Sequence, residues 1–292
     1  MNGPMHVALK SGTRVFSDNR AKALHYSPRA INLQFDDRVV TLLNRDGILS
    51  PSSIVLDLAS LPSMTYAEYH GDVLDTDRFR VKVTNFRDLH VSETLALGEE
   101  SLAKAISQFI QPRRHSISIA LLMLRGMPCA LDGMEKAVAE KELSILKDGG
   151  SWSGLADKLL GLGFGLTPSG DDFMMGAISV LNLQGIDTSA VRSVVDSYAN
   201  PFSRTILRNA LDGYYIEPLG SLVKELALGT LNTSRILGLL KLGHTSGLDT
   251  LSGIYFALKG GIIEGQTGDS LGSAGLCSAP MTGAVHGRTV AE

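Results

Sequence analysis

Apolar and β-branched residues alternate or cluster between turn-forming residues through roughly the first ninety positions of the chain. This pattern predicts β-strands within residues 6–17, 30–45, 53–60 and 78–86. One of these segments runs into a turn-forming sequence, Arg-Asp-Gly at residues 45–47, as expected where a strand ends. The N-terminal third is therefore expected to be rich in β-structure.

The period of the pattern changes near residue 94, where apolar residues begin to recur at intervals of three and four. Residues 93–110 and 131–148 show this period, with charged residues between the apolar ones. A later helix is expected to begin after Asn200, whose side chain can cap free N–H groups, with Pro201 in the first helical position. Most of the remaining chain is therefore expected to be helical.

These patterns predict an α+β fold, in which a β-rich N-terminal domain precedes a mainly α-helical domain. The expected boundaries place the β-rich domain at residues 1–92 and the helical domain at residues 93–265. Residues 266–292 are mostly small and polar, and we expect a flexible tail there.

Composition limits the classes of function that the chain can serve. Of its 292 residues, 44% are hydrophobic and 20% are charged, and the formal charge of −3 offers no basic surface for nucleic acid or an anionic membrane. No apolar run reaches the roughly 20 residues that cross a bilayer. Cys129 and Cys277 are too few for a disulfide framework or a thiolate metal site. We expect a soluble, cytoplasmic protein.

A glycine-rich segment, GLGFGLTPSGDDFMMGAI at residues 161–178, leads directly into an apolar helical pattern. Gly163 and Gly165 can adopt positive φ angles and let the backbone approach a ligand closely. Thr167 or Ser169 is expected to cap the helix that follows, whose first N–H groups and dipole suit an anion. The segment is neither a P-loop, since no lysine follows the glycines, nor a GxGxxG fingerprint.

A second segment, TSGLDTLSG at residues 245–253, shares the pattern Ser-Gly-x-Asp-x-x-x-Gly with the first. The equivalent pairs are Ser169 with Ser246, Gly170 with Gly247, Asp172 with Asp249, and Gly176 with Gly253. Either segment alone is better explained as a capping box, in which the serine oxygen accepts an N–H and the acid bonds back to the serine N–H. Capping, however, needs neither the glycine run nor the extra carboxylate of Asp171.

Two similar helix starts in one chain favour a pseudo-symmetric packing in which both face a common pocket. The candidate catalytic residues of this pocket are Asp171, Asp172, His244 and Asp249. Its candidate substrate- or anion-binding residues are Gly163, Gly165, Thr167, Ser169, Gly170, Arg204, Thr245, Ser246 and Gly247. Carboxylates repel a phosphate, so the pocket suits a ligand with amide or carbamoyl N–H groups, or a Mg²⁺ ion that bridges the charges. The acidic spacing matches no metal motif, and no cofactor is predicted beyond this Mg²⁺ alternative.

Three basic residues near these segments have two interpretations each. His244 could act as an acid or base in the pocket, or form hydrogen bonds within its own loop. Arg204 and Arg208 stand one helical turn apart and could clamp an anion, or lie on a solvated helix face.

Three motifs resemble those of a bacterial family, the AllH-type subunits of oxamate carbamoyltransferase, whose members are also labelled carboxylases. The motifs are GLGFGLTPSGDDFMMG at residues 161–176, SRTILRNALDG at residues 203–213 and GHTSGLDTLSG at residues 243–253. The first is long and specific, and the other two support it by their order along the chain. The β-rich third resembles the family more loosely, and the tail does not match it.

The resemblance implies a subunit of a carbamoyltransferase in allantoin degradation, a branch of purine catabolism. Such an enzyme transfers a carbamoyl group between oxalurate and phosphate, giving oxamate and carbamoyl phosphate, and its other subunits are the implied partners. Three roles stay open: an enzyme subunit with its pocket at the two helix starts, a non-catalytic subunit that binds a small anion or supports assembly, and a Mg²⁺-assisted enzyme. Fixed donors at helix starts and on hydroxyl side chains would suit carbamoyl transfer.

Overall fold

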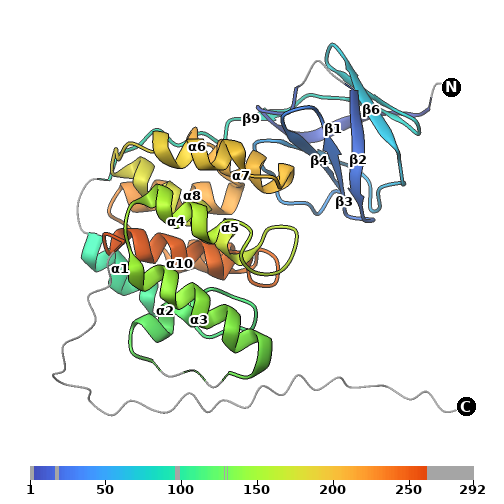
Figure 1. The fold of residues 1–292 in the computed structure, drawn as a ribbon. Helices are drawn as coiled ribbons and strands as arrows, with labels where there is room; N and C mark the ends of the chain where they lie inside the picture. The colour runs from blue at the N-terminus through green and yellow to red at the C-terminus, as the bar shows by residue number, and fades with distance from the viewer. Residues whose placement is uncertain (1–2, 17–19, 96–98, 128, 130, 262–292) are drawn as a thin grey trace, which may run out of the picture.

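The computed structural model describes residues 3–16, 20–95, 99–127, 129 and 131–261. Strands occupy the N-terminal part, up to Arg87, and helices occupy the part from Glu99 to Leu258 (Figure 1). This confirms the predicted α+β fold with a β-rich N-terminus. The predicted tail, with Cys277, lies outside the described residues.

The N-terminal strands form a closed, barrel-like sheet. The strands are β1 (Met5–Gly12), β2 (Arg20–Tyr26), β3 (Ala30–Gln34), β4 (Val39–Leu43), β5 (Ser53–Leu56), β6 (Tyr66–His70), β7 (Val73–Thr76), β8 (Arg80–Lys82) and β9 (Phe86–Arg87). Eight of them follow the order β5-β4-β3-β2-β6-β7-β8-β1, and β1 pairs back onto β5, with Ser11 opposite Ile54. Strand β9 runs parallel to the end of β1. Closure leaves few exposed edges for unwanted pairing.

The barrel is held together by the inward-facing apolar side chains of its strands. Among the largest, at 0–1% exposure, are Ile31, Leu33 and Leu42 in the strands, and Phe35 and Phe79 directly beside them. The four predicted segments overlap six of the nine strands that the structure describes. The pattern missed β2, β6 and β7, because these short strands carry charged and aromatic residues on exposed faces, and few apolar residues alternate along them.

The C-terminal part contains ten helices within the described residues. They are α1 (Glu99–Ser107), α2 (Ser118–Leu124), α3 (Gly133–Asp148), α4 (Trp152–Leu159), α5 (Ser169–Leu183), α6 (Ser189–Ser197), α7 (Pro201–Leu211), α8 (Glu217–Ala227), α9 (Thr233–Leu240) and α10 (Ser246–Leu258). Helix α7 begins as predicted: Asn200 accepts hydrogen bonds from the N–H groups of Phe202 and Ser203, and Pro201 is the first helical residue. Within the described ranges, no helix has the length and apolarity to cross a membrane.

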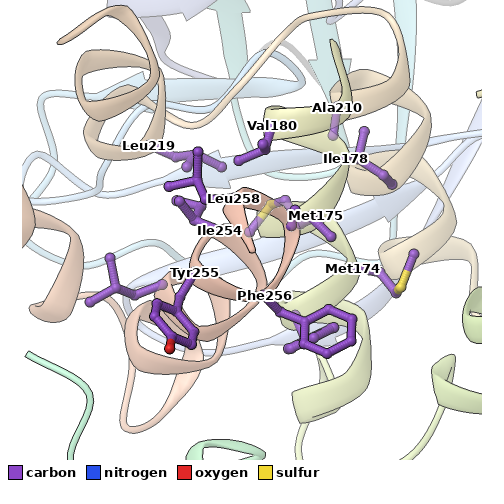
Figure 2. Close-up of a cluster of buried hydrophobic side chains, with 14 of the residues drawn as sticks. Met174, Met175, Ile178, Val180, Ala210, Leu219, Ile254, Tyr255, Phe256 and Leu258 are labelled. Carbon is purple, nitrogen blue, oxygen red and sulfur yellow. The ribbon is translucent and has the colours of Figure 1, made fainter. Parts of the chain in front are cut away.

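Helices α5 and α10 form the centre of the helical domain (Figure 1). Both are buried along nearly their whole length, and their apolar side chains, such as Met174, Ile254 and Phe256, belong to one cluster (Figure 2). The two helices approach most closely at Gly176 and Gly253, where a Cβ atom would collide with a carbonyl oxygen of the other helix. The close approach is therefore possible only because both positions are glycine.

Several polar contacts join the barrel to the helices. Arg14 forms an ion pair with Asp212 at 2.5 Å, the N–H of Val39 donates to Thr205 Oγ1 at 2.8 Å, and the N–H of Glu217 donates to the carbonyl of Leu49 at 3.0 Å. These bonds hold the barrel, at the residues after β1 and around β4, against α7, the residue after α7 and the first residue of α8.

We predict that Gly253→Ala lowers the free energy of unfolding by about 1–3 kcal/mol or more, because the added methyl group forces α5 and α10 apart. Gly238→Ala in α9 is the matched control, since a Cβ atom there meets nothing within 4 Å. The control should leave stability unchanged or raise it by up to about 1 kcal/mol. Urea denaturation of both variants measures the difference. Equal stability of the two variants would contradict the close helix contact.

Candidate functional site

The two Ser-Gly-x-Asp segments begin the two central helices, α5 at Ser169 and α10 at Ser246. The packing of these helices brings their N-terminal ends together. Thr167, Asp172 and Ser246 all line one cavity, and Ser246 donates a hydrogen bond to the side chain of Asp172. The structure thus brings residues of both segments to one place.

The expected capping role of the serines is wrong. The N-cap residues are Pro168 and Thr245, neither with a side-chain capping bond, and each serine is already the first helical residue. Backbone carbonyls accept the first amides instead: Leu162 accepts from the N–H of Gly170 and Pro168 from the N–H of Asp171, both at 2.9 Å. Ser169 turns away and donates to Glu142 Oε1 at 3.2 Å. Because these amides are bonded within the loop, the start of α5 has few N–H groups left for an anion.

The candidate glycines shape the backbone around the site. Gly163 and Gly165 have φ angles of 114° and 101°, and a Cβ atom on Gly163 would strike Ser169. Gly170 and Gly247 lie against the carbonyl oxygens of the preceding helices, at Leu159 and Leu239, where there is no space for a side chain. These four glycines therefore let the loops turn and the helices approach.

The cavity lies between the barrel and the helical domain and has a volume of about 270 Å³. The barrel side contributes Val39, Thr41, Leu43, Ile48, Ser50, Pro51, Ser52 and Ser53. The helical side contributes Thr167, Asp172, Met175, Phe202, Thr205, Ile206, Asn209, Tyr214, Tyr215, Ile216, Leu242, Gly243, Ser246 and Thr250. Of the described residues that line it, Asp172 is the sole carboxylic acid, and none is a lysine, arginine or histidine. The cavity is thus largely apolar, with one acid and several hydroxyl groups.

Asp172 is 4% exposed and accepts a hydrogen bond from Thr167 Oγ1 at 3.1 Å. Burial raises the pKa of its carboxyl group to about 8, and the negative charge of nearby Asp249 adds to the rise. The hydrogen bonds from Ser246 and Thr167 oppose it without cancelling it. Near neutral pH, Asp172 therefore retains its proton in much of the population and can donate a hydrogen bond.

Asp249, the equivalent residue on α10, is completely buried. Its Oδ1 atom accepts hydrogen bonds from Ser116 Oγ and from the N–H of Ile117 at 3.0 Å, whereas Oδ2 has no partner among the described residues. Burial raises its pKa to about 7, and the charge of Glu142 contributes to the rise. Asp249 does not line the cavity, so it acts on Asp172 through charge.

Other predicted site residues lie apart from the cavity. Asp171 accepts hydrogen bonds from the N–H of Gly161 at 2.8 Å and from the hydroxyl of Tyr198 at 3.1 Å, so it holds the glycine-rich loop in place. The side chain of His244 is exposed, and its carbonyl accepts from Arg113. Arg204 donates to the carbonyl of Tyr198 at 2.8 Å. Thr245 supplies its carbonyl to the N–H groups of Leu248 and Asp249 in the first turn of α10.

Sequence analysis missed Glu142 and the whole barrel wall of the cavity. Glu142 is 2% exposed, and burial raises its pKa to about 7. A signal for it exists: Glu142 stands on the buried stripe of α3, with Ala139 and Ile145 on either side. The barrel residues carry no comparable signal, since their position depends on contacts distant in sequence. No group of three or more possible metal ligands is found in the part of the chain that the structure describes.

We predict that Asp172 makes the free energy of unfolding fall as pH rises from about 4 to about 8. Its pKa is about 8 in the folded protein, against an ordinary value of 3.8, so in this range the folded protein holds a proton that the unfolded chain has released. Asp172→Asn removes this proton uptake. The variant should therefore gain stability relative to the wild type as pH rises through this range, and the gain should level off above it.

Urea denaturation across this pH range measures the effect. Asp157→Asn, at an exposed position of α4, is the matched control and should follow the wild type. Parallel pH profiles for all three proteins would mean that Asp172 is ionised in the folded state.

Comparison with known proteins agrees with the motifs. No solved structure matches the chain. The segment from the end of α4 to the end of α10 contains both helix starts and the carboxyl group that faces the cavity. This segment, residues 159–258, matches the model of the family described as oxamate carbamoyltransferase subunit AllH, which confirms the resemblance that the sequence predicts.

Proposed function

We propose that this chain is a carbamoyltransferase subunit whose interdomain cavity binds the carbamoyl or amide end of oxalurate, oxamate or carbamoyl phosphate. The observation that carries the proposal is the buried carboxyl group of Asp172, which faces a largely apolar cavity beside Thr167 and Ser246. The family match supports the class of reaction, since that family is described as a subunit of oxamate carbamoyltransferase.

The chemistry of Asp172 suits an amide better than an anion. A protonated carboxyl group presents an O–H donor beside an acceptor oxygen, and a carbamoyl group presents a carbonyl beside N–H donors, so the two can form a pair of hydrogen bonds. The apolar walls strengthen such bonds by excluding water. An ionised carboxylate in the same position would repel the charged ends of all three compounds.

The same proton can take part in transfer. When the carbamoyl carbon of oxalurate passes to a phosphate oxygen, the bond from that carbon to the oxamate nitrogen breaks and the nitrogen takes up a proton. We assign Asp172 as the donor of that proton, because its pKa of about 8 lies close to neutral pH. In the reverse direction the same carboxylate recovers the proton.

We predict that oxalurate or carbamoyl phosphate raises the unfolding temperature of the purified chain, and that Asp172→Leu, which removes both the donor and the acceptor, abolishes the rise. A ligand at about a hundredfold excess over Kd stabilises the native state by about 2.7 kcal/mol, which a thermal-shift assay detects. The panel comprises oxamate, oxalurate, carbamoyl phosphate, phosphate and adenine nucleotides, each with and without Mg²⁺. A Mg²⁺ requirement would favour the metal-assisted alternative.

Asp157→Leu, at an exposed position, is the control and should keep the full shift. A shift that survives in Asp172→Leu would place the ligand elsewhere on the chain. No shift with any carbamoyl compound would contradict binding by this subunit on its own, and would favour a role in assembly.

A further inference from the structure

The proposed ligands are anions, yet the cavity offers no positive charge to balance them. None of the described residues around it is basic, and its acid lies at the start of α5. The first N–H groups of that helix already make hydrogen bonds: those of Gly170, Asp171 and Asp172 donate to loop carbonyls at 2.9–3.2 Å. An anionic group of a ligand must therefore be bound outside the cavity, or remain in solvent.

A second hollow, of about 60 Å³, adjoins the cavity and carries the missing charge. It is lined by three arginines, Arg14, Arg38 and Arg208, together with Asp37. Arg14 and Arg38 come from the barrel, and Arg208 comes from α7, so the hollow lies on the same domain boundary as the cavity. The lining alone has three positive charges against one negative charge.

Three polar residues line both spaces and make them neighbours: Ser52, Thr205 and Asn209. Asn209 Nδ2 donates to Ser52 Oγ at 3.0 Å, so this shared wall joins the barrel to α7. Thr205 Oγ1 accepts from the N–H of Val39 at 2.8 Å. A ligand that passes along this wall meets hydroxyl and amide groups and avoids apolar side chains.

The three guanidinium groups are held in position by bonds that use only part of their donors. Arg38 donates from Nε to Asp37 and from Nη1 to the carbonyl of Phe16, and Arg208 donates from Nε to Asp196 and from Nη1 to the carbonyl of Asp37. In both, Nη2 makes no hydrogen bond to the described residues. Each guanidinium carries five N–H groups, so donors remain for an oxyanion.

Arg14 is held in the same way, through Nη1 to Asp212, which Arg192 also contacts. The side chains of Arg14, Arg38 and Arg208 are 30%, 37% and 30% exposed, so each reaches solvent and has part of its hydration shell removed. With the ion-pair partners outside the lining included, the cluster has four arginines and three aspartates, Asp37, Asp196 and Asp212. Its net charge is therefore +1.

We propose that Arg14, Arg38 and Arg208 form an oxyanion site that binds phosphate, either free or as the phosphoryl group of a ligand whose other end enters the cavity. Arginine suits this because its planar N–H groups match the oxygens of phosphate and its charge persists at all physiological pH values. The joint use of hollow and cavity by one ligand rests on the proposed function. The binding of free phosphate does not.

A plain alternative exists, in which the arginines serve only to hold the two domains together. The ion pair of Arg14 with Asp212 has this effect, since it joins β1 to the residue after α7. A variant of Arg38 distinguishes an anion-binding role from a purely structural one. The side chain of Arg38 bonds only within the barrel among the described residues, to Asp37 and to the carbonyl of Phe16. Loss of Arg38 should therefore leave the domain contact in place and weaken the anion site.

The test is isothermal titration of the purified full chain with inorganic phosphate, at constant ionic strength, for three proteins. Arg38→Gln should weaken phosphate binding about tenfold or more, since a charged hydrogen bond is lost. Arg45→Gln is the matched control: Arg45 also lies in the barrel, where it pairs with Asp57 at 3.5 Å, but it does not line the hollow. The control should bind phosphate like the wild type.

No phosphate binding by the wild type would overturn the proposal, and so would equal binding by Arg38→Gln and the wild type. If Arg38→Gln fails to fold, Arg208→Gln takes its place, with the same expectation. Asp172→Leu separates the two proposals. It should keep phosphate binding while losing the effect of carbamoyl compounds, so that either proposal can fail without the other.

Discussion

The contact between α5 and α10 at Gly176 and Gly253 is the constraint on which the rest of the structure depends. Without side chains at these two positions, the helix backbones approach closely enough for their first turns to share one space. The approach places Ser246 against Asp172 and the charge of Asp249 close by. Any side chain at Gly176 or Gly253 would push the two helices apart and move Ser246 away from Asp172. The local chemistry thus depends on a packing contact one turn away from it.

Burial of three acids around these helix starts works against stability. Asp172, Asp249 and Glu142 each have a raised pKa, chiefly because burial disfavours their charged forms. Hydroxyl donors, among them Thr167 for Asp172, reduce the penalty without removing it. Natural sequences keep such unfavourable groups mainly where function needs them. Burial destabilises the protonated form of each acid less than the charged form. An acid can therefore face a largely apolar space when it keeps its proton.

Sequence reasoning recovered the elements whose information is local. The helix start at Asn200, the change of period near residue 94 and the equivalence of the two Ser-Gly-x-Asp segments are all encoded within a few residues. The predicted capping by Ser169 is wrong, because the carbonyl of Leu162 in the loop accepts the N–H of Gly170 in place of a side chain. Closure of the barrel could not be predicted, since it depends on the pairing of β1 with β5. The barrel residues that line the cavity could not be predicted from the sequence for the same reason.

The two walls of the cavity differ in whether they lie within the segment that matches the family. The family match covers residues 159–258, which supply Asp172, Ser246 and the α7 side of the cavity. The opposite wall, from Val39 to Ser53, and two of the three arginines of the hollow lie outside that match. A chain could therefore keep the motif and its carboxyl group while its barrel presents other side chains to the ligand. Under the proposed function, the helical part would then select the reacting group, and the barrel would select the size and charge of the rest of the ligand.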